Sequence, residues 1–242
     1  MPIIKLDAID STNDYLKQLS KKTDLENYTV VMANEQTRGK GQMGAKWVSE
    51  KGKNLTMSVL VNSFSLKDKN IFDLNIATAL SAVTVLKNSA IPNVFVKWPN
   101  DIMADSKKVA GILIENSLKS DGSFTAIIGI GLNLNQTNFE ALPQASSLRC
   151  VTNEIYDVDE IAFRLVESLK EYLQILDKST DLLWDEYHKN LYKINYPSAF
   201  EDNQGKRFMG IIQKVTREGK LVVLLENDSI AHFEVKEVKM LY

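Results

Sequence analysis

The chain has 242 residues and a nearly balanced charge, with 29 Lys and Arg against 31 Asp and Glu and a formal net charge of −2. Hydrophobic residues make up 44% and charged residues 25%, as in an ordinary soluble globular protein. This composition excludes the strongly basic character of many nucleic-acid-binding domains, and no segment approaches the roughly 20 apolar residues of a membrane span. We therefore expect neither nucleic acid nor membrane among its partners.

The cysteine and histidine content also fits an ordinary soluble globular protein. A single cysteine, Cys150, excludes an intramolecular disulfide and fits the reducing cytoplasm, where we expect the protein. The two histidines, His188 and His232, lie far apart in the sequence without cysteine partners, so no zinc site is predicted. The length allows one large domain and one small domain.

The first 134 residues alternate predicted strands and helices. Short apolar or β-branched stretches bounded by turn residues predict strands over residues 3–9, 29–34, 55–61, 94–97, 102–104, 109–114 and 124–134. Apolar residues at helical spacing predict a helix that follows N-cap candidates at 10–13 and runs to about Lys21, and a core helix over about 70–88. The last strand is an almost unbroken apolar run, typical of a strand buried on both faces.

The pattern changes near residues 196–197. Before this point, helical spacing predicts a long amphipathic helix from Ile161 to Leu176 and a second one from Trp184 to Leu191. After it, turn residues separate predicted strands over 207–215, 221–225, 230–235 and 238–241. So many short strands in so short a segment predict a small barrel. We place the domain boundary near 194, with one domain over 1–194 and the other over 195–242.

A glycine-punctuated basic loop covers residues 38–47. It contains Gly39, Lys40, Gly41 and Gly44 and ends at Trp47. Backbone N–H groups of such a loop, together with its lysine, could bind a phosphate. It is not a Walker A loop, because G-x-x-x-x-G-K-[ST] is absent. A flexible surface turn is the alternative, and residue types alone do not decide between the two.

A second polar cluster follows the predicted strand at 94–97 and reads Lys97-Trp98-Pro99-Asn100-Asp101. Lys97 could neutralise a carboxylate or a developing phosphate charge, and Asp101 could help hold a magnesium ion. Turn chemistry accounts for the last three residues but not for Lys97 and Trp98.

Two weaker signals accompany these clusters. Ser11-Thr12-Asn13 is an N-cap sequence, and a helix N-terminus also presents hydrogen-bonding groups to ligands. Asn133 and Asn135 stand at alternate positions, where we expect them on one face of a sheet, and an amide side chain suits an adenine edge.

Taken in order, these segments resemble the biotin protein ligases. The resemblance rests on Ser11-Thr12-Asn13, Gln36 with the 39–44 loop and Trp47, Lys97 to Asp101, Lys108 to Leu113, and Gly129 to Asn133. It covers residues 3–135, and the C-terminal segment resembles the family's small SH3-like barrel more loosely. It implies an α+β fold with a mixed β-sheet and flanking helices, like a class II synthetase, followed by an SH3-like β-barrel.

The resemblance also implies a reaction and its residues. Biotin and MgATP would give biotinyl-5′-AMP, and a lysine of the biotin carrier domain of a biotin-dependent carboxylase would then take up the biotin. Because two anions must approach each other, positive groups and magnesium must offset their repulsion. The implied catalytic residues are Lys97, Lys40, Asp101 and Lys108, with Asp101 as the magnesium ligand. The implied biotin-binding residues are Ser11, Thr12, Asn13, Gln36, Gly39, Lys40, Gly41, Gln42, Trp47, Lys97, Gly111 and Gly129. The implied ATP-binding residues are Lys40, Trp47, Asn100, Lys97 and Asn133.

The sequence departs from the family pattern in two places. The family loop often reads Gly-Arg-Gly-Arg, but Lys40 and Gln42 stand here, so we expect Arg38 or Lys46 to supply part of the missing charge. The first strand begins at Ile3, so we expect no DNA-binding domain and no repressor function. A lipoate or octanoate protein ligase, and a non-catalytic module that binds biotin or a carrier domain, are the alternatives. We expect a monomer or a homodimer.

Overall fold

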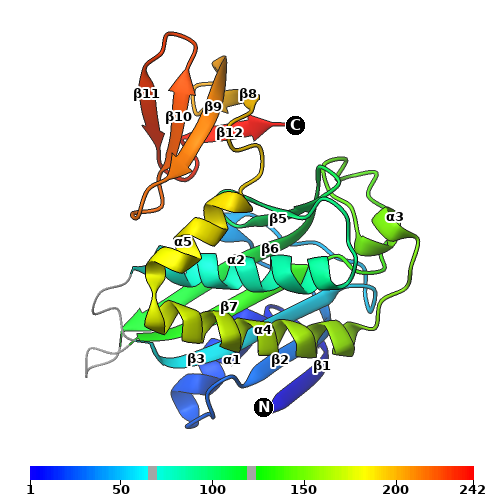
Figure 1. Ribbon diagram of the computed structural model, residues 1–242. Helices are drawn as coiled ribbons and strands as arrows, with labels where there is room; N and C mark the ends of the chain where they lie inside the picture. Colours follow the sequence, from blue (N-terminus) through cyan, green and yellow to red (C-terminus); the bar gives the residue numbers. More distant parts are fainter. Residues whose placement is uncertain (65–69, 119–123) are drawn as a thin grey trace.

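The computed structural model describes residues 1–64, 70–118 and 124–242. Its centre is a seven-stranded mixed sheet with the strand order β1-β2-β3-β7-β6-β5-β4 (Figure 1). The strands are β1 (Ile3–Ile9), β2 (Val30–Gln36), β3 (Leu55–Phe64), β4 (Phe95–Lys97), β5 (Asp101–Ala104), β6 (Lys107–Leu118) and β7 (Phe124–Leu132). The β1–β2 pair is parallel and the other neighbouring pairs are antiparallel. The predicted mixed sheet is confirmed.

Helices cover both faces of this sheet. On one face α2 (Ile71–Asn88) and α4 (Val158–Lys178) lie side by side, with α5 (Thr180–Lys189) next to them (Figure 1). On the other face α1 (Thr12–Lys22) buries Leu16 against Leu60 and Ile127. Because strand side chains alternate between faces, Ile128 belongs to the α2–α4 core while its neighbour Ile127 lies under α1. The prediction that β7 is buried on both faces is confirmed. None of the described helices is long and apolar enough to cross a membrane.

Three short elements were not predicted. They are the 3₁₀ turn Gln42–Gly44, α3 (Leu148–Thr152) and β8 (Pro197–Asp202). The first two are too short to show a hydrophobic period. The strand β8 begins with a proline, a residue allowed in a sheet at a strand's first position but otherwise read as a break.

The C-terminal segment forms a second sheet. It is antiparallel, has the order β11-β10-β9-β8-β12, and adds β9 (Arg207–Val215), β10 (Leu221–Leu225), β11 (Ile230–Phe233) and β12 (Val238–Leu241) to β8. The strands β11 and β12 stand at its two edges, so the ladder does not close into the predicted barrel. Trp98 Nε1 donates to Gly219 O at 2.8 Å and fastens this sheet to the strand end that carries Lys97.

Candidate active site

A cavity of about 550 Å³ lies between the large sheet, the glycine loop and the C-terminal sheet. Segments far apart in the chain meet there, and the predicted residues that line it are Ser11, Thr12, Asn13, Gln36, Lys40, Gly41, Gln42, Trp47, Lys97, Asn100, Asp101, Lys108, Gly111 and Gly129. A second hollow of about 400 Å³ shares Trp47, Lys97, Asp101 and Lys108 with the first and extends to Asn133. Gly39 lines neither hollow.

Ser11, Thr12, Asn13 and Gln36 line one end of the cavity, and Ser58 is bonded to Thr12 and Asn13 behind them. We call these five residues the polar end. Ser11, Thr12 and Asn13 are each 3% exposed, and Ser58 is fully buried. Gln36 Oε1 accepts from Thr12 N at 2.8 Å, and Ser58 Oγ lies 2.8 Å from Thr12 Oγ1 and 2.6 Å from Asn13 Oδ1. Buried polar groups in such a network are held in fixed orientations. This end can therefore hydrogen-bond a ligand head group without rearrangement.

A row of glycines forms the floor next to the polar end. Register places Gly129 of β7 opposite Ser58 and Leu113, and Gly131 opposite Gly111. A Cβ atom on Gly129 would stand 2.4 Å from Asn13 Oδ1, and one on Gly131 would stand 2.4 Å from the Trp47 indole. Glycine is therefore required for the close approach of both side chains. The Gly129-Ile130-Gly131 segment thus marks the surface on which Trp47 lies.

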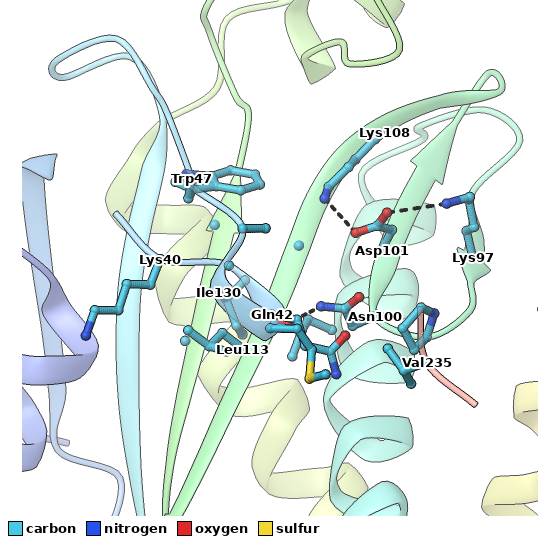
Figure 2. Close-up of a pocket in the computed structure, with 18 of the residues that line it drawn as sticks. Lys40, Gln42, Trp47, Lys97, Asn100, Asp101, Lys108, Leu113, Ile130 and Val235 are labelled. Carbon is cyan, nitrogen blue, oxygen red and sulfur yellow. Dashed lines mark hydrogen bonds and ion pairs between the residues drawn. The ribbon is translucent and has the colours of Figure 1, made fainter. Parts of the chain in front are cut away.

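The centre of the cavity holds a charged triad of Lys97, Asp101 and Lys108 (Figure 2). Lys108 Nζ lies 2.6 Å from Asp101 Oδ1, and Lys97 Nζ lies 3.6 Å from Asp101 Oδ2. Lys97 and Asp101 side chains are each only 15% exposed. Burial lowers the pKa of Lys97, and the positive charge of Lys108 lowers it further against the opposing effect of Asp101. Two cations with one shared anion leave a net positive site, which suits a substrate that carries several negative charges.

Aromatic rings flank the two lysines of the triad. Lys108 Nζ lies 5.7 Å from the centre of the Trp47 ring, and Lys97 Nζ lies 4.9 Å from the centre of the Tyr242 ring. A cation over an aromatic face is attracted to it, most strongly where water is excluded. Burial and the charge of Asp101 raise the pKa of Tyr242 to about 12, so its phenol is neutral at physiological pH. The rings therefore help to orient both ammonium groups.

The geometry does not fit the predicted role of Asp101 as a magnesium ligand. Both oxygens of the carboxylate pair with ammonium groups, so a metal ion there would face two positive charges. Among the described residues, no three His, Cys, Asp or Glu side chains gather to hold a metal. Magnesium often binds through one or two carboxylates plus substrate phosphates, so it can enter with a nucleotide.

The glycine loop folds back on itself. Gly41 N donates to Ala45 O at 2.7 Å and Trp47 N donates to Gly39 O at 3.0 Å, while a Cβ on Gly39 would stand 2.4 Å from Trp47 O. This hairpin delivers the Trp47 indole to the glycine floor. Gly39 therefore shapes the loop from outside the cavity.

Lys40, an implied catalytic and ligand-binding residue, lines the cavity apart from the charged triad. Its ammonium pairs with Asp14 of α1 at 2.7 Å and lies on the side of the cavity away from Asp101 (Figure 2). Arg38 pairs with Asp10 and does not line the cavity, which removes the support for its predicted compensating charge. Lys46 lines both hollows and is the better candidate for that role.

The predicted asparagines have separate environments. Asn100 Nδ2 donates to Ile112 O at 2.6 Å and ties β5 to β6, so its amide braces the triad's strands. Asn133 Nδ2 donates to Ser146 O at 2.9 Å beside the second hollow. The expectation that Asn133 and Asn135 share a sheet face is wrong, because β7 ends at Leu132 and Asn135 bonds to the backbone of Tyr156.

Several residues of the site and its surroundings were not found from the sequence. Ser58 and Glu115 hydrogen-bond Asn13 from strands without motifs, and Lys236 and Tyr242 line the hollows from the C-terminal segment. One signal was available: Thr56 and Ser58 are two polar residues on the same face of the otherwise apolar stretch 55–61. The C-terminal residues had no such signal, because only the packing of the second sheet brings them to the cavity.

Comparison with known proteins agrees with this geometry. Residues 6–133 match the model of the biotin/lipoate A/B protein ligase family, which is more than half of the chain. The chain belongs to this family. The chain is similar to the bifunctional ligase/repressor BirA of Bacillus subtilis, 30% identical over 76% of this chain and 59% of that protein's own length. The biotin–[acetyl-CoA-carboxylase] ligase of Mycobacterium tuberculosis is 28% identical over 87% of this chain and 79% of its own length.

Solved structures of the family extend the likeness to the second sheet. The biotin protein ligase of Aquifex aeolicus in complex with biotin and ATP superposes with a TM-score of 0.80 at 26% identity, covering 99% of this chain and 98% of that one. The ligase of Leishmania major with biotinyl-5-AMP has a TM-score of 0.67 at 24% identity and shares the fold. The chain spans about 59% of the length of the Bacillus relatives it matches.

Proposed function

We propose that this protein is a biotin protein ligase. It joins biotin to ATP as biotinyl-5′-AMP and then transfers the biotinyl group to a lysine of a biotin carrier domain. The observation that carries the proposal is one cavity with a buried polar end, a glycine floor under Trp47 and a positive triad in the middle. The named activities of its relatives and of the Aquifex structure support the same reaction.

The polar end is the proposed site of the biotin ring, and the triad is the proposed site of its carboxylate and of the α-phosphate. In the first step, a carboxylate oxygen bonds to the α-phosphorus and the bond to pyrophosphate breaks. Lys97 and Lys108 offset the repulsion between the two anions and stabilise the charge that develops. Asp101 holds both ammonium groups in place. Magnesium enters as part of the substrate MgATP.

In the second step the neutral amine of an acceptor lysine bonds to the acyl carbon. The bond from that carbon to the AMP oxygen breaks, AMP leaves, and the amine loses a proton. The mixed anhydride must be kept from water until the acceptor arrives. Residues 38–47 and the turn around Lys236, whose Nζ donates to Met43 O at 2.5 Å, cover it in this proposal.

The second hollow is the proposed nucleotide site, with Asn133, Trp47 and Lys97 along its lining. We further propose that residues 1–194 act as the catalytic domain and that residues 195–242 form an SH3-like domain that completes one cavity wall. The cytoplasm, a monomer or homodimer, a carboxylase carrier domain as partner and the absence of nucleic-acid binding remain predictions.

A lipoate or octanoate ligase is the second candidate, because the family includes such enzymes. A dithiolane or an alkyl end has no hydrogen bonds to offer, and the buried groups of the polar end would stay unpaired against it. The polar end therefore favours biotin. A module that only binds ligand would need no charged triad.

Biotin-dependent exchange of labelled pyrophosphate into ATP tests the proposal. Exchange with biotin, together with a carrier domain that gains the mass of one biotinyl group, is the expected result. Exchange with lipoate or octanoate but not with biotin would replace the proposal by the second candidate. Tight binding of biotin without any exchange would reduce the protein to a binding module.

A further inference from the structure

The strand β1 forms one edge of the large sheet, and within the described sheet it pairs only with β2. We propose that this edge is an interface between two copies of the chain. In this interface β1 of each copy pairs antiparallel with β1 of the other, across a two-fold axis at Leu6. Residues 3–9 line neither the cavity nor the second hollow, so the interface does not depend on the proposed function.

The outer side of β1 carries open backbone groups. Val30 N of β2 donates to Pro2 O at 2.9 Å. Alternate residues of a strand direct their N–H and C=O groups to opposite sides, so those of Ile3, Lys5 and Asp7 point away from β2. Natural sheets often protect such an edge with a proline or a bulge. Residues 3–9 contain no proline, and their register with β2 has no bulge, so β1 can accept a further strand.

The two charges of β1 select one register for a pair of copies. With Leu6 on the axis, Lys5 stands opposite the partner's Asp7, and Asp7 stands opposite the partner's Lys5. An axis at Lys5 would place two lysines opposite each other, and an axis at Asp7 would place two aspartates opposite each other. Facing charges of opposite sign stabilise a strand pair and like charges destabilise it. The Leu6 register is therefore favoured over both of its neighbours.

The apolar residues of β1 agree with this register. Ile3 stands opposite the partner's Ile9, Ile4 stands opposite the partner's Ala8, and the two Leu6 side chains meet at the axis. In the single chain Ile3 is 44% exposed. Pairing in this register therefore covers apolar surface as well as joining opposite charges, and a two-fold axis makes the same contacts twice.

The ion pairs that β1 makes within one chain do not prevent this pairing. Lys5 pairs with Asp159 at 2.6 Å and Asp7 pairs with Lys51 at 2.8 Å, and all four side chains are more than half exposed. Exposed ion pairs contribute about 0–1 kcal/mol, so these side chains can adjust at low cost. In the dimer Lys5 would lie between Asp159 of its own chain and the partner's Asp7, which extends a row of alternating charges.

The helix on the neighbouring face leaves the edge clear. The helix α1 packs on β2, β3 and β7, where Leu16 lies against Val31, Leu60 and Ile127. Figure 1 shows β1 at the rim of the sheet. A second strand can therefore approach along the whole of β1.

Sedimentation equilibrium of the full chain between about 1 μM and 1 mM tests the interface. We expect a monomer–dimer equilibrium for the wild type in this range. Lys5→Glu sets two acidic side chains opposite each other, and Asp7→Lys sets two lysines opposite each other, so each variant should dimerise at least about tenfold more weakly. Lys206→Glu, a charge reversal in the exposed turn between β8 and β9, should dimerise like the wild type.

A mixture of the Lys5→Glu and Asp7→Lys chains gives a sharper measurement. In a mixed dimer with the Leu6 register, each facing pair again joins an acidic and a basic side chain. The mixture should therefore recover wild-type association within about threefold. Circular dichroism of each variant distinguishes a loss of pairing from a loss of fold. A mixture of folded variants that associates no better than its components overturns the inference.

Hydrogen exchange of the wild type locates the interface without any variant. The amides of Lys5 and Asp7 should gain protection as the protein concentration rises. A wild type that stays monomeric at about 1 mM overturns the inference. A dimer that instead protects residues 113–118 of β6, which extend past the end of β5, also overturns it. Neither result affects the proposed ligase activity.

Discussion

The two ends of the cavity are held in different ways. At the polar end, Thr12, Asn13 and Ser58 are at most 3% exposed and bonded to one another within the sheet and the start of α1. At the glycine-loop end, Met43 is 60% exposed, and Lys40 reaches a solvent-facing carboxylate. The C-terminal sheet contacts this loop through the exposed side chain of Lys236.

The difference assigns recognition and closure to separate parts of the molecule. Exposed ion pairs contribute about 0–1 kcal/mol, whereas leaving a buried polar group unpaired costs about 1–3 kcal/mol. The polar end is therefore preformed, and the loop can open at low cost. A reaction with a water-sensitive intermediate needs both properties, a fixed place for the ring and a cover that admits substrates.

The largest expected effect comes from the charged triad between the two ends. Lys97→Ala should slow biotin-dependent pyrophosphate exchange about a hundredfold or more, because it removes a positioned charge from the reacting centre. The melting temperature should change little, since the charge of Lys97 is already disfavoured by burial. Lys214→Ala, on the exposed side of β9, is the control. Near wild-type exchange in Lys97→Ala would remove the triad from the proposed mechanism.

The next largest effect should come from the glycine floor. In Gly131→Ala the new Cβ would stand 2.4 Å from the Trp47 indole, whereas in Gly111→Ala it would stand 3.2 Å from it. Overpacking of this kind costs about 1–3 kcal/mol, so Gly131→Ala should speed release of biotinyl-5′-AMP about tenfold. Gly111→Ala should have a smaller effect. Rates of biotinyl-5′-AMP release after rapid dilution show which variant is affected more. Equal rates for both variants would contradict the close contact between Gly131 and the Trp47 indole.

The pH dependence of the pyrophosphate-exchange rate should follow the protonation state of Lys97. Burial lowers the pKa of its ammonium below the ordinary 10.5, so the charge that supports adenylation is lost at a lower pH than for an exposed lysine. The alkaline limb of the rate profile should therefore lie below pH 10.5. Lys97→Arg keeps its charge and should move that limb upward, even if its maximal rate is lower. If the alkaline limb lies at the same pH in both proteins, loss of the Lys97 proton does not cause it.

The lowered pKa of Lys97 also makes the stability of the folded protein depend on pH. The unfolded chain binds the Lys97 proton more tightly than the folded chain, so stability rises with pH between the lowered pKa and 10.5. Chemical denaturation of wild type and Lys97→Met across this range measures the contribution. Wild type should gain stability relative to Lys97→Met as the pH rises.

The smallest effect is expected at the exposed end. Lys236→Ala removes the bond to Met43 O and should speed release of the adenylate about twofold to tenfold, without changing biotin affinity in the absence of ATP. Lys206→Ala, in the exposed turn between β8 and β9, serves as the control. Weakened binding of biotin alone would mean that the loop contributes to recognition, and the comparison of the two ends would need revision.

The sequence predicted those parts of the fold and site whose signals are local. Hydrophobic periods identified the strands and helices of the large domain, and contiguous motifs identified Thr12, Trp47, Lys97 and Asp101. Ser58 and Glu115 were missed because only strand register brings them together beside Asn13. Side-chain conformations could not be predicted either. The sequence does not show that Lys40 pairs with Asp14, or that the Asp101 carboxylate pairs with both Lys97 and Lys108.

Backbone hydrogen exchange, with and without biotin and MgATP, tests the division between the two ends most directly. Amides of β3 and β7 around Ser58 and Gly129 should be protected in the free protein and change little when biotinyl-5′-AMP forms. Amides of residues 39–46 should exchange quickly in the free protein and become protected with the adenylate. A loop that is fully protected before ligand is added, or strands at the polar end that become protected only afterwards, would contradict the account.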